Sequence, residues 1–136
     1  MFFDMQHKHE MVWWAVFVWL ALLSATAFAH HSVTAQFDPS KEFTVTGVLK
    51  HVDWTNPHIY VWVEAKGSDG SLVTWSFEGN PPGLLHRAGV TKDVFKVGET
   101  VTVTAMPAND GTKNLGFGKV YRYADDHEIR LSIARE

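Results

Sequence analysis

Two adjacent histidines, His30 and His31, follow an apolar segment that ends in Ala27-Phe28-Ala29. Small residues at positions 27 and 29 form a signal-peptidase recognition pattern, so cleavage after Ala29 would make His30 the first residue of the mature chain. A terminal histidine offers its α-amine and its imidazole Nδ1 to one metal ion, and nitrogen ligands of this kind suit copper. The sequence therefore predicts a copper ion at the mature N-terminus.

His58 is the residue that we expect to complete this site. It follows Asn56-Pro57, and because proline restricts the backbone on both sides of the bond, the turn fixes where the imidazole starts. His30 and His58 would together supply three nitrogens, and His31 is a further candidate ligand. The alternative interpretation is that His30 and His31 are frayed terminal residues and that His58 begins a strand and bonds to the backbone.

A second group of candidate residues lies on the stretch from His58 to Ala65, where two kinds of side chain alternate. Alternation in a strand places Tyr60, Trp62 and Glu64 on one face and the aliphatic residues on the other, which is the natural core face. Outward aromatic surfaces bind sugars, peptides or flat organic ligands. The sequence predicts such a ligand face, although large aromatics also cover strand edges or fill the second sheet of a sandwich.

Signals for an enzyme are weak in this chain. No nucleophile motif, phosphate-binding loop or helix-borne pair of metal ligands is present. His51, Asp53 and Glu78 could come together as an acid–base group, but carboxylates that end strands are usually solvated. We therefore expect a binding protein without catalytic residues.

The first 29 residues have the order of a secretory signal peptide: a polar start, an apolar block from Met11 to Leu23, and the small residues before His30. The apolar block is shorter than the roughly 20 residues that a membrane-spanning helix needs. We expect a periplasmic or secreted protein, which would contact a membrane only if the leader stayed uncleaved.

Residues 30–136 are enough for a single domain with one modest core. Cysteine is absent, so neither disulfides nor thiolate ligands are available. Outside the leader, seven Lys and four Arg stand against thirteen Asp and Glu without a basic run, which argues against a nucleic acid as partner. A metal ion or a small molecule remains as the expected ligand, and a protein partner is not specified.

The order of elements in this domain is typical of an OB-type β-barrel, in which a helix joins the third strand to the fourth. β-Branched and alternating stretches predict the strands, and Pro81-Pro82 and Gly89 delimit a short helix over 81–88. A glycine within the first strand, Gly47, indicates a bulge or bend. The alternative is an antiparallel sandwich with one helical crossover. The expected strands are 42–54, 58–65, 71–78, 100–105, 115–123 and 128–133, after an extended arm over 30–41.

Several motifs together resemble those of a family of small exported bacterial proteins, the domain-of-unknown-function family 6152. They are His30-His31-Ser32, Phe37-Asp38, Gly47-Val48, Trp54-Thr55-Asn56-Pro57-His58, Trp75-Ser76-Phe77-Glu78, Leu84-Leu85-His86-Arg87-Ala88-Gly89, Val97-Gly98-Glu99 and Pro107-Ala108-Asn109-Asp110-Gly111. The resemblance implies export and a small β-rich fold, and it brings no established activity. The chain departs from the family at Asp125-Asp126-His127, where the family has an Asp-Gly turn.

Overall fold

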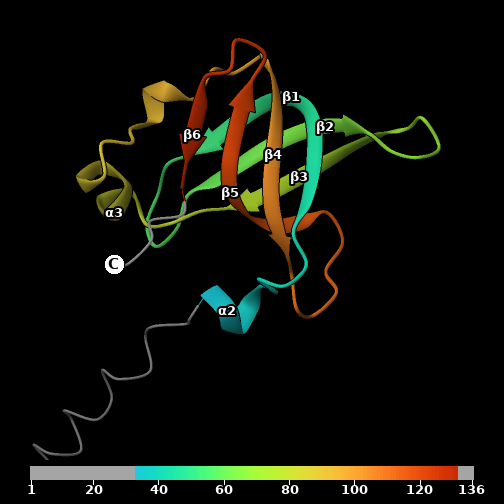
Figure 1. The fold of residues 1–136 in the computed structure, drawn as a ribbon, viewed down its shortest axis with the longest axis horizontal. Helices are drawn as coiled ribbons and strands as arrows, with labels where there is room; N and C mark the ends of the chain where they lie inside the picture. Colours follow the sequence, from blue (N-terminus) through green and yellow to red (C-terminus); the bar gives the residue numbers. More distant parts are fainter. Residues whose placement is uncertain (1–32, 132–136) are drawn as a thin grey trace, which may run out of the picture. The chain divides into compact units, whose positions relative to one another are not determined.

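A computed structural model of the chain describes residues 33–131, all of which belong to one compact unit. Within this range, the six strands and the helix between the third and fourth strands follow the order that the sequence predicts for an OB-type barrel, and two further short helical segments, α2 and η1, are present (Figure 1). The elements are α2 (Val33–Gln36), β1 (Phe43–Asp53), β2 (Tyr60–Lys66), β3 (Leu72–Glu78), α3 (Pro82–Arg87), η1 (Lys92–Val94), β4 (Thr100–Pro107), β5 (Leu115–Tyr123) and β6 (Glu128–Arg130).

The sheet closes on itself into a five-stranded barrel. Its strands follow the order β3-β2-β1-β4-β5-β6, and a further pairing joins β3 to β5. That closing contact is parallel and short, with Ser76, Phe77 and Glu78 opposite Leu115, Gly116 and Phe117. β6 lies outside the ring, paired with the second half of β5. The predicted OB-like barrel is therefore confirmed, and the sandwich is excluded.

β1 pairs with two different strands along its two halves because it bends along its length. Its first half pairs with β4 and its second half with β2, and the two sets of pairs meet at Val48. A Cβ atom on Gly47 would clash with the carbonyl of Glu64 and lie 2.9 Å from Cγ1 of Val63, so only glycine permits this close crossing of the strands. The register irregularity itself falls between Leu49 and His51.

The turns follow the predicted chemistry. The amide of Gly67 bonds to the carbonyl of Ser71 across the β2–β3 turn, and Gly70 there has a positive φ of 82°. α3 begins at proline, as predicted, and Gly89 follows its end with φ of 79°. In the β5–β6 turn Asp126 itself adopts φ of 62°, the conformation that glycine would take more easily.

The arm before β1 is not extended throughout, so that expectation was wrong for its described part. Val33–Gln36 form one helical turn, α2, and Phe37 then makes an isolated bridge to Ala108. The side chain of Asn109 donates to the carbonyls of Thr34 and Ala35. Phe37 packs with Met106 and Phe117 in a small second core beneath this turn, and burial of these side chains favours a compact arm.

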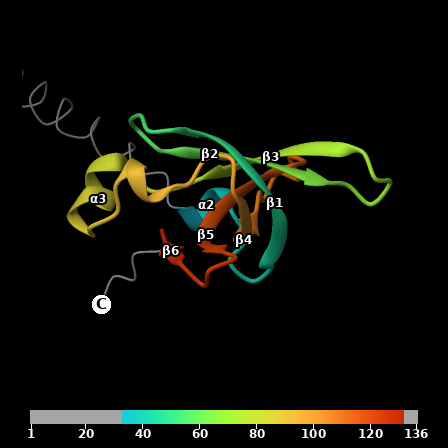
Figure 2. The same ribbon diagram turned by 90° about the horizontal axis from the view of Figure 1, so that it is seen from above.

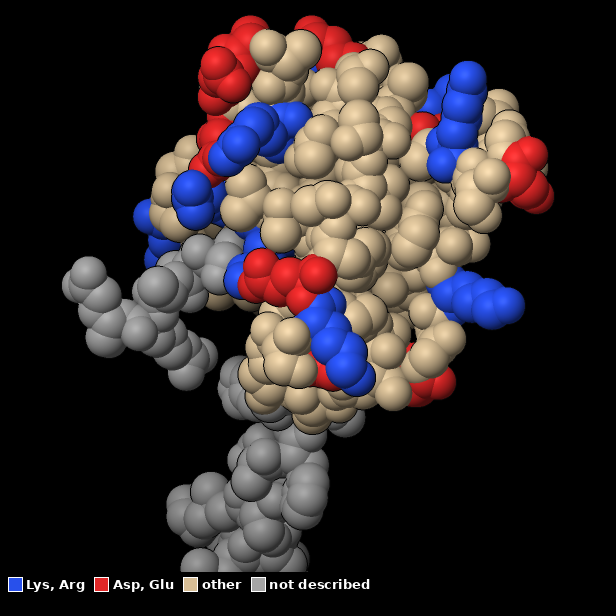
Figure 3. Space-filling view, turned by 45° about the vertical axis from the view of Figure 1, so that its right-hand side comes forward, with Lys and Arg blue, Asp and Glu red and all other residues tan. Residues whose placement is uncertain are grey.

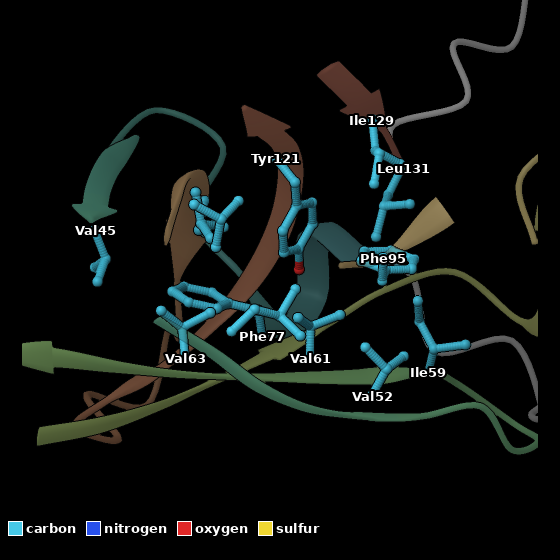
Figure 4. Packing of buried hydrophobic residues seen from close by; sticks show 14 of the residues in the cluster. Val45, Val52, Ile59, Val61, Val63, Phe77, Phe95, Tyr121, Ile129 and Leu131 are labelled. Carbon is cyan, nitrogen blue, oxygen red and sulfur yellow. The ribbon is translucent and has the colours of Figure 1, made fainter. Parts of the chain in front are cut away.

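The barrel interior is filled by aliphatic residues of β1, β2 and β4 and by the aromatic residues Phe77 of β3 and Tyr121 and Tyr123 of β5. Tyr121 is fully buried and meets Phe77 and Phe95 edge to face. Figure 4 shows its hydroxyl pointing into the cluster between Phe77 and Val61. Within the described residues this hydroxyl has no hydrogen-bond partner, an arrangement that costs free energy in an apolar interior.

Two tyrosines on β5 provide a matched test of this packing. Tyr121→Phe removes an unpartnered hydroxyl, so the free energy of unfolding should stay the same or rise by up to about 1 kcal/mol. Tyr123→Phe removes the hydroxyl that accepts the amide of Lys96 at 3.0 Å, so it should lower that free energy by about 1 kcal/mol. Urea unfolding measures both changes. A Tyr121→Phe variant that is less stable than Tyr123→Phe would contradict the packing.

Candidate functional site

A buried carboxylate marks the end of β3. Glu78 points to the outer face of the barrel, yet only 7% of its surface is exposed. Removing a carboxylate from water is unfavourable unless hydrogen-bond donors or a cation compensate it. Two neighbouring side chains, His58 and Tyr60, approach its two oxygens.

His58 lies in the β1–β2 loop, directly after the cis peptide bond between Asn56 and Pro57. Its Nδ1 is 2.6 Å from Oε1 of Glu78. A bare nitrogen lone pair would be repelled by a carboxylate at this distance, so the proton of the imidazole belongs on Nδ1. The lone pair of the neutral ring is then on Nε2, and the His58 side chain is 30% exposed. A carboxylate that orients a histidine in this way is common behind metal-binding and proton-transferring imidazoles.

Tyr60 contacts the same carboxylate from the start of β2. Its hydroxyl donates to Oε2 of Glu78 at 3.0 Å, and the two residues are direct cross-strand partners. Burial, followed by the negative charge of Glu78 and the hydrogen bond to it, raises the pKa of the Tyr60 phenol above its ordinary value. We call His58, Tyr60 and Glu78 the His58 cluster.

The side chains of the predicted ligand face point outward from β2, as the alternation of residue types in this strand predicts. Val61 and Val63 are fully buried, whereas Tyr60, Trp62 and Glu64 face outward from β2. Two of the three already have partners within the domain, because Tyr60 bonds to Glu78 and Glu64 pairs with Lys50 at 3.3 Å. Trp62 is the exposed member, with 37% of its surface accessible, between its cross-strand neighbours His51 and Ser76.

The other predicted metal ligands, His30 and His31, lie outside the described residues. Over residues 33–131, no three His, Cys, Asp or Glu side chains are grouped so that they could hold a metal ion. His58 therefore has one acidic neighbour in this part of the chain and no second imidazole. Over the same range, no helix has the length and apolar character to cross a membrane.

Sequence reasoning misjudged Glu78, which it treated as a solvated carboxylate at a strand end. The sequence did contain a signal that pairs Glu78 with Tyr60. The β2–β3 pairs are placed symmetrically about Asp69 in the turn, and this symmetry sets Tyr60 opposite Glu78. The predicted acid–base group is spread over three strands: Asp53 is opposite Tyr60, which lies between it and Glu78, and His51 is opposite Trp62, two pairs farther along.

Charges on the described surface are mixed. On the face shown in Figure 3, basic and acidic side chains lie in small groups of both signs around a broad area without charge. Ion pairs in the described part of the chain include Arg122 with Glu128 at 2.7 Å and Lys96 with Asp125 at 3.0 Å. No continuous basic patch is visible on the face shown in Figure 3.

Comparison with known proteins identifies the family. Residues 17–117 match a family described as "Family of unknown function (DUF6152)", and this range covers well over half of the chain. The chain belongs to this family. The match ends early in β5, so the β5–β6 turn with Asp126 lies beyond it. No curated protein and no solved structure gave a significant match.

The Tyr60–Glu78 contact predicts how this tyrosine titrates. Glu78→Gln removes the carboxylate charge, so the pKa of Tyr60 should fall toward 10.0 while remaining above it because the burial persists. In the unaltered protein the folded state holds the phenol proton more tightly than the unfolded chain. Stability should therefore decrease as the pH rises from about 10 to the higher folded-state pKa of Tyr60.

Carbon NMR of the tyrosine ring carbons over a pH series measures this effect. Tyr123 is the internal control, because burial is the main cause of its raised pKa and Glu78 is not among the causes. An unchanged Tyr60 titration in Glu78→Gln, or an equal displacement of Tyr123, would contradict the assigned contact.

Proposed function

We propose that this protein is an exported binding protein that holds a copper ion through His58 and the histidines at its mature N-terminus. The observation that carries the proposal is the 2.6 Å approach of Glu78 to Nδ1 of His58. It directs the lone pair of the neutral ring to Nε2, the nitrogen that can then bind a metal. Imidazole is a preferred ligand of copper, and a carboxylate behind it raises the basicity of the ligand.

The remaining copper ligands would come from the histidines that directly follow the predicted cleavage site. Cleavage after Ala29 provides the α-amine and Nδ1 of His30, and His31 offers another imidazole. A chelating terminus supplies two nitrogens from one residue, so a single turn-fixed histidine is enough to complete a three-nitrogen set. The His58 cluster contributes one such histidine, already oriented by its neighbour.

A non-metal binding module is the second candidate. Trp62 is exposed on β2, and its neighbours His51 and Ser76 are polar. An aromatic side chain flanked by polar groups can stack on a sugar ring or a flat organic molecule. In this case the ligand would bind to the face of Tyr60, Trp62 and Glu64, and His58 would only stabilise Glu78.

The proposal first requires that the leader is removed. When the full chain is expressed in a host with a periplasm, the intact mass of the exported product should equal that of residues 30–136. A soluble periplasmic product that retains residues 1–29 would contradict both the cleavage and the terminal chelate.

Calorimetry with Cu(II) then tests the ligands. His58→Ala, and separately one glycine inserted before His30, should each weaken binding by 10-fold or more, since each removes a direct ligand or its chelate geometry. Glu78→Gln should weaken binding by about 10- to 100-fold, because the orienting carboxylate is lost while the side-chain shape is kept. His86→Ala is the matched control, because His86 is an exposed histidine on α3 outside the His58 cluster.

Unchanged affinity in His86→Ala, together with losses in the other three variants, supports the copper site. Equal and weak binding by all of the proteins contradicts it. Circular dichroism of each variant checks that the barrel is intact, because loss of His58 leaves a buried carboxylate with one donor fewer.

A further inference from the structure

A groove lies where the β2–β3 hairpin leaves the barrel, and it is separate from the His58 cluster. β2 pairs with β1 only through Tyr60 to Glu64, and β3 pairs with β5 only from Ser76 onward. Residues 65–75 therefore extend beyond the ring as a two-stranded arm, which projects on the side opposite α3 in two perpendicular views (Figures 1 and 2). The sheet is open between this arm and the first half of β1.

Two adjoining hollows occupy this opening, and both are lined by Trp75 and Asn114. One has a volume of about 490 Å³, and its other lining residues are three apolar ones, Phe43, Pro107 and Leu115, together with Lys41, Glu42, Thr112 and Lys113. The other, of about 350 Å³, lies between the arm and Thr44–Thr46 of β1. Each volume falls in the range of small-molecule sites. We call the pair the Trp75 groove.

The aromatic wall of the groove is held in place by packing. Trp75 is stacked on Phe77 with an interplanar angle of 5° and a centroid separation of 6.0 Å. The Phe43 ring is 5.2 Å from that of Trp75. Gly116 makes room for Phe43, since a Cβ there would come within 3.1 Å of that ring. A half-buried indole fixed by two rings offers an apolar surface at little cost in side-chain entropy.

The charged residues that line the groove are mainly basic. Lys41 and Lys113 line the larger hollow and Lys66 the smaller one. No ion pair involving Lys66 or Lys113 occurs among residues 33–131, and Lys41 has an exposed pair with Asp38 at 3.1 Å. The one carboxylate in the lining, that of Glu42, is paired with Lys119. The local field therefore favours an anion beside the aromatic wall.

From this combination we propose that the Trp75 groove binds a small flat organic molecule with a carboxylate, such as an aromatic acid. The apolar ring of the ligand packs against Trp75 and Phe43, and its carboxylate lies near the lysines of the groove. This site is distinct from the outward face of Tyr60 and Trp62, because Trp75 and Trp62 are on opposite faces of the sheet. The proposal does not depend on copper binding.

2-Naphthoate is a suitable probe, titrated into the purified protein and followed through the indole N–H signals in NMR spectra. The signal of Trp75 should shift saturably with a Kd below about 1 mM, a reasonable affinity for a ligand of this size. The uncharged analogue 2-naphthalenemethanol should bind at least 3-fold more weakly, and added salt should weaken naphthoate binding.

Variants then locate the site. Trp75→Ala should reduce naphthoate affinity by 10-fold or more, and the pair Lys66→Glu with Lys113→Glu by at least 3-fold. The two lysines are exposed, so their reversal tests the site without disturbing the core. Trp62→Ala is the matched aromatic control, and His58→Ala separates this proposal from the copper site. Both should bind naphthoate as the unaltered protein does.

Three results would overturn the proposal: no saturable shift up to about 5 mM naphthoate, a loss in Trp62→Ala as large as in Trp75→Ala, or no response to reversal of the two lysines. The second result would instead place an organic ligand on the β2 face.

Discussion

The parallel pairing of β3 with β5 is the contact on which the other features of this domain depend. Three residues of each strand make it, Ser76 to Glu78 against Leu115 to Phe117, and it turns a curved sheet into a closed ring. Closure buries Phe77 and Tyr121 together and removes most of the open sheet edge. Because the pairing is short, it also leaves the rest of β3 without a neighbour on that side, and the Trp75 groove opens there.

The same contact places Glu78 where its charge must be compensated. The residue ends β3 beside Phe117, and its carboxylate is nearly excluded from water. Removing one partner of a buried charge commonly costs about 3–5 kcal/mol, so the donors from His58 and Tyr60 are needed for stability as well as for any function. Their approach depends on the β1–β2 loop and on the β2–β3 register. One arrangement thus stabilises the end of β3 and orients a histidine toward solvent.

Much of this architecture follows from local sequence signals. Alternation identifies the faces of β2, glycine and aspartate identify the hairpin turn, and proline with glycine delimits α3. The arm before β1 was mispredicted because the burial of Phe37 against Met106 and Phe117 is a tertiary effect. The burial of Glu78 and the groove beside Trp75 depend on the contact between β3 and β5, which lie far apart in the sequence. The residue pattern within either strand does not encode that contact, so it could not be predicted from local sequence signals.

The central claim of this account is that Glu78 fixes the imidazole of His58 with its proton on Nδ1 and its lone pair on Nε2. Long-range ¹H–¹⁵N correlation spectra of the metal-free protein distinguish the two neutral tautomers directly, at a pH where the ring is uncharged. The account predicts the Nδ1–H tautomer for His58, and a loss of this preference in Glu78→Gln. A neutral His58 with its proton on Nε2, or a tautomer ratio that Glu78→Gln leaves unchanged, would contradict it.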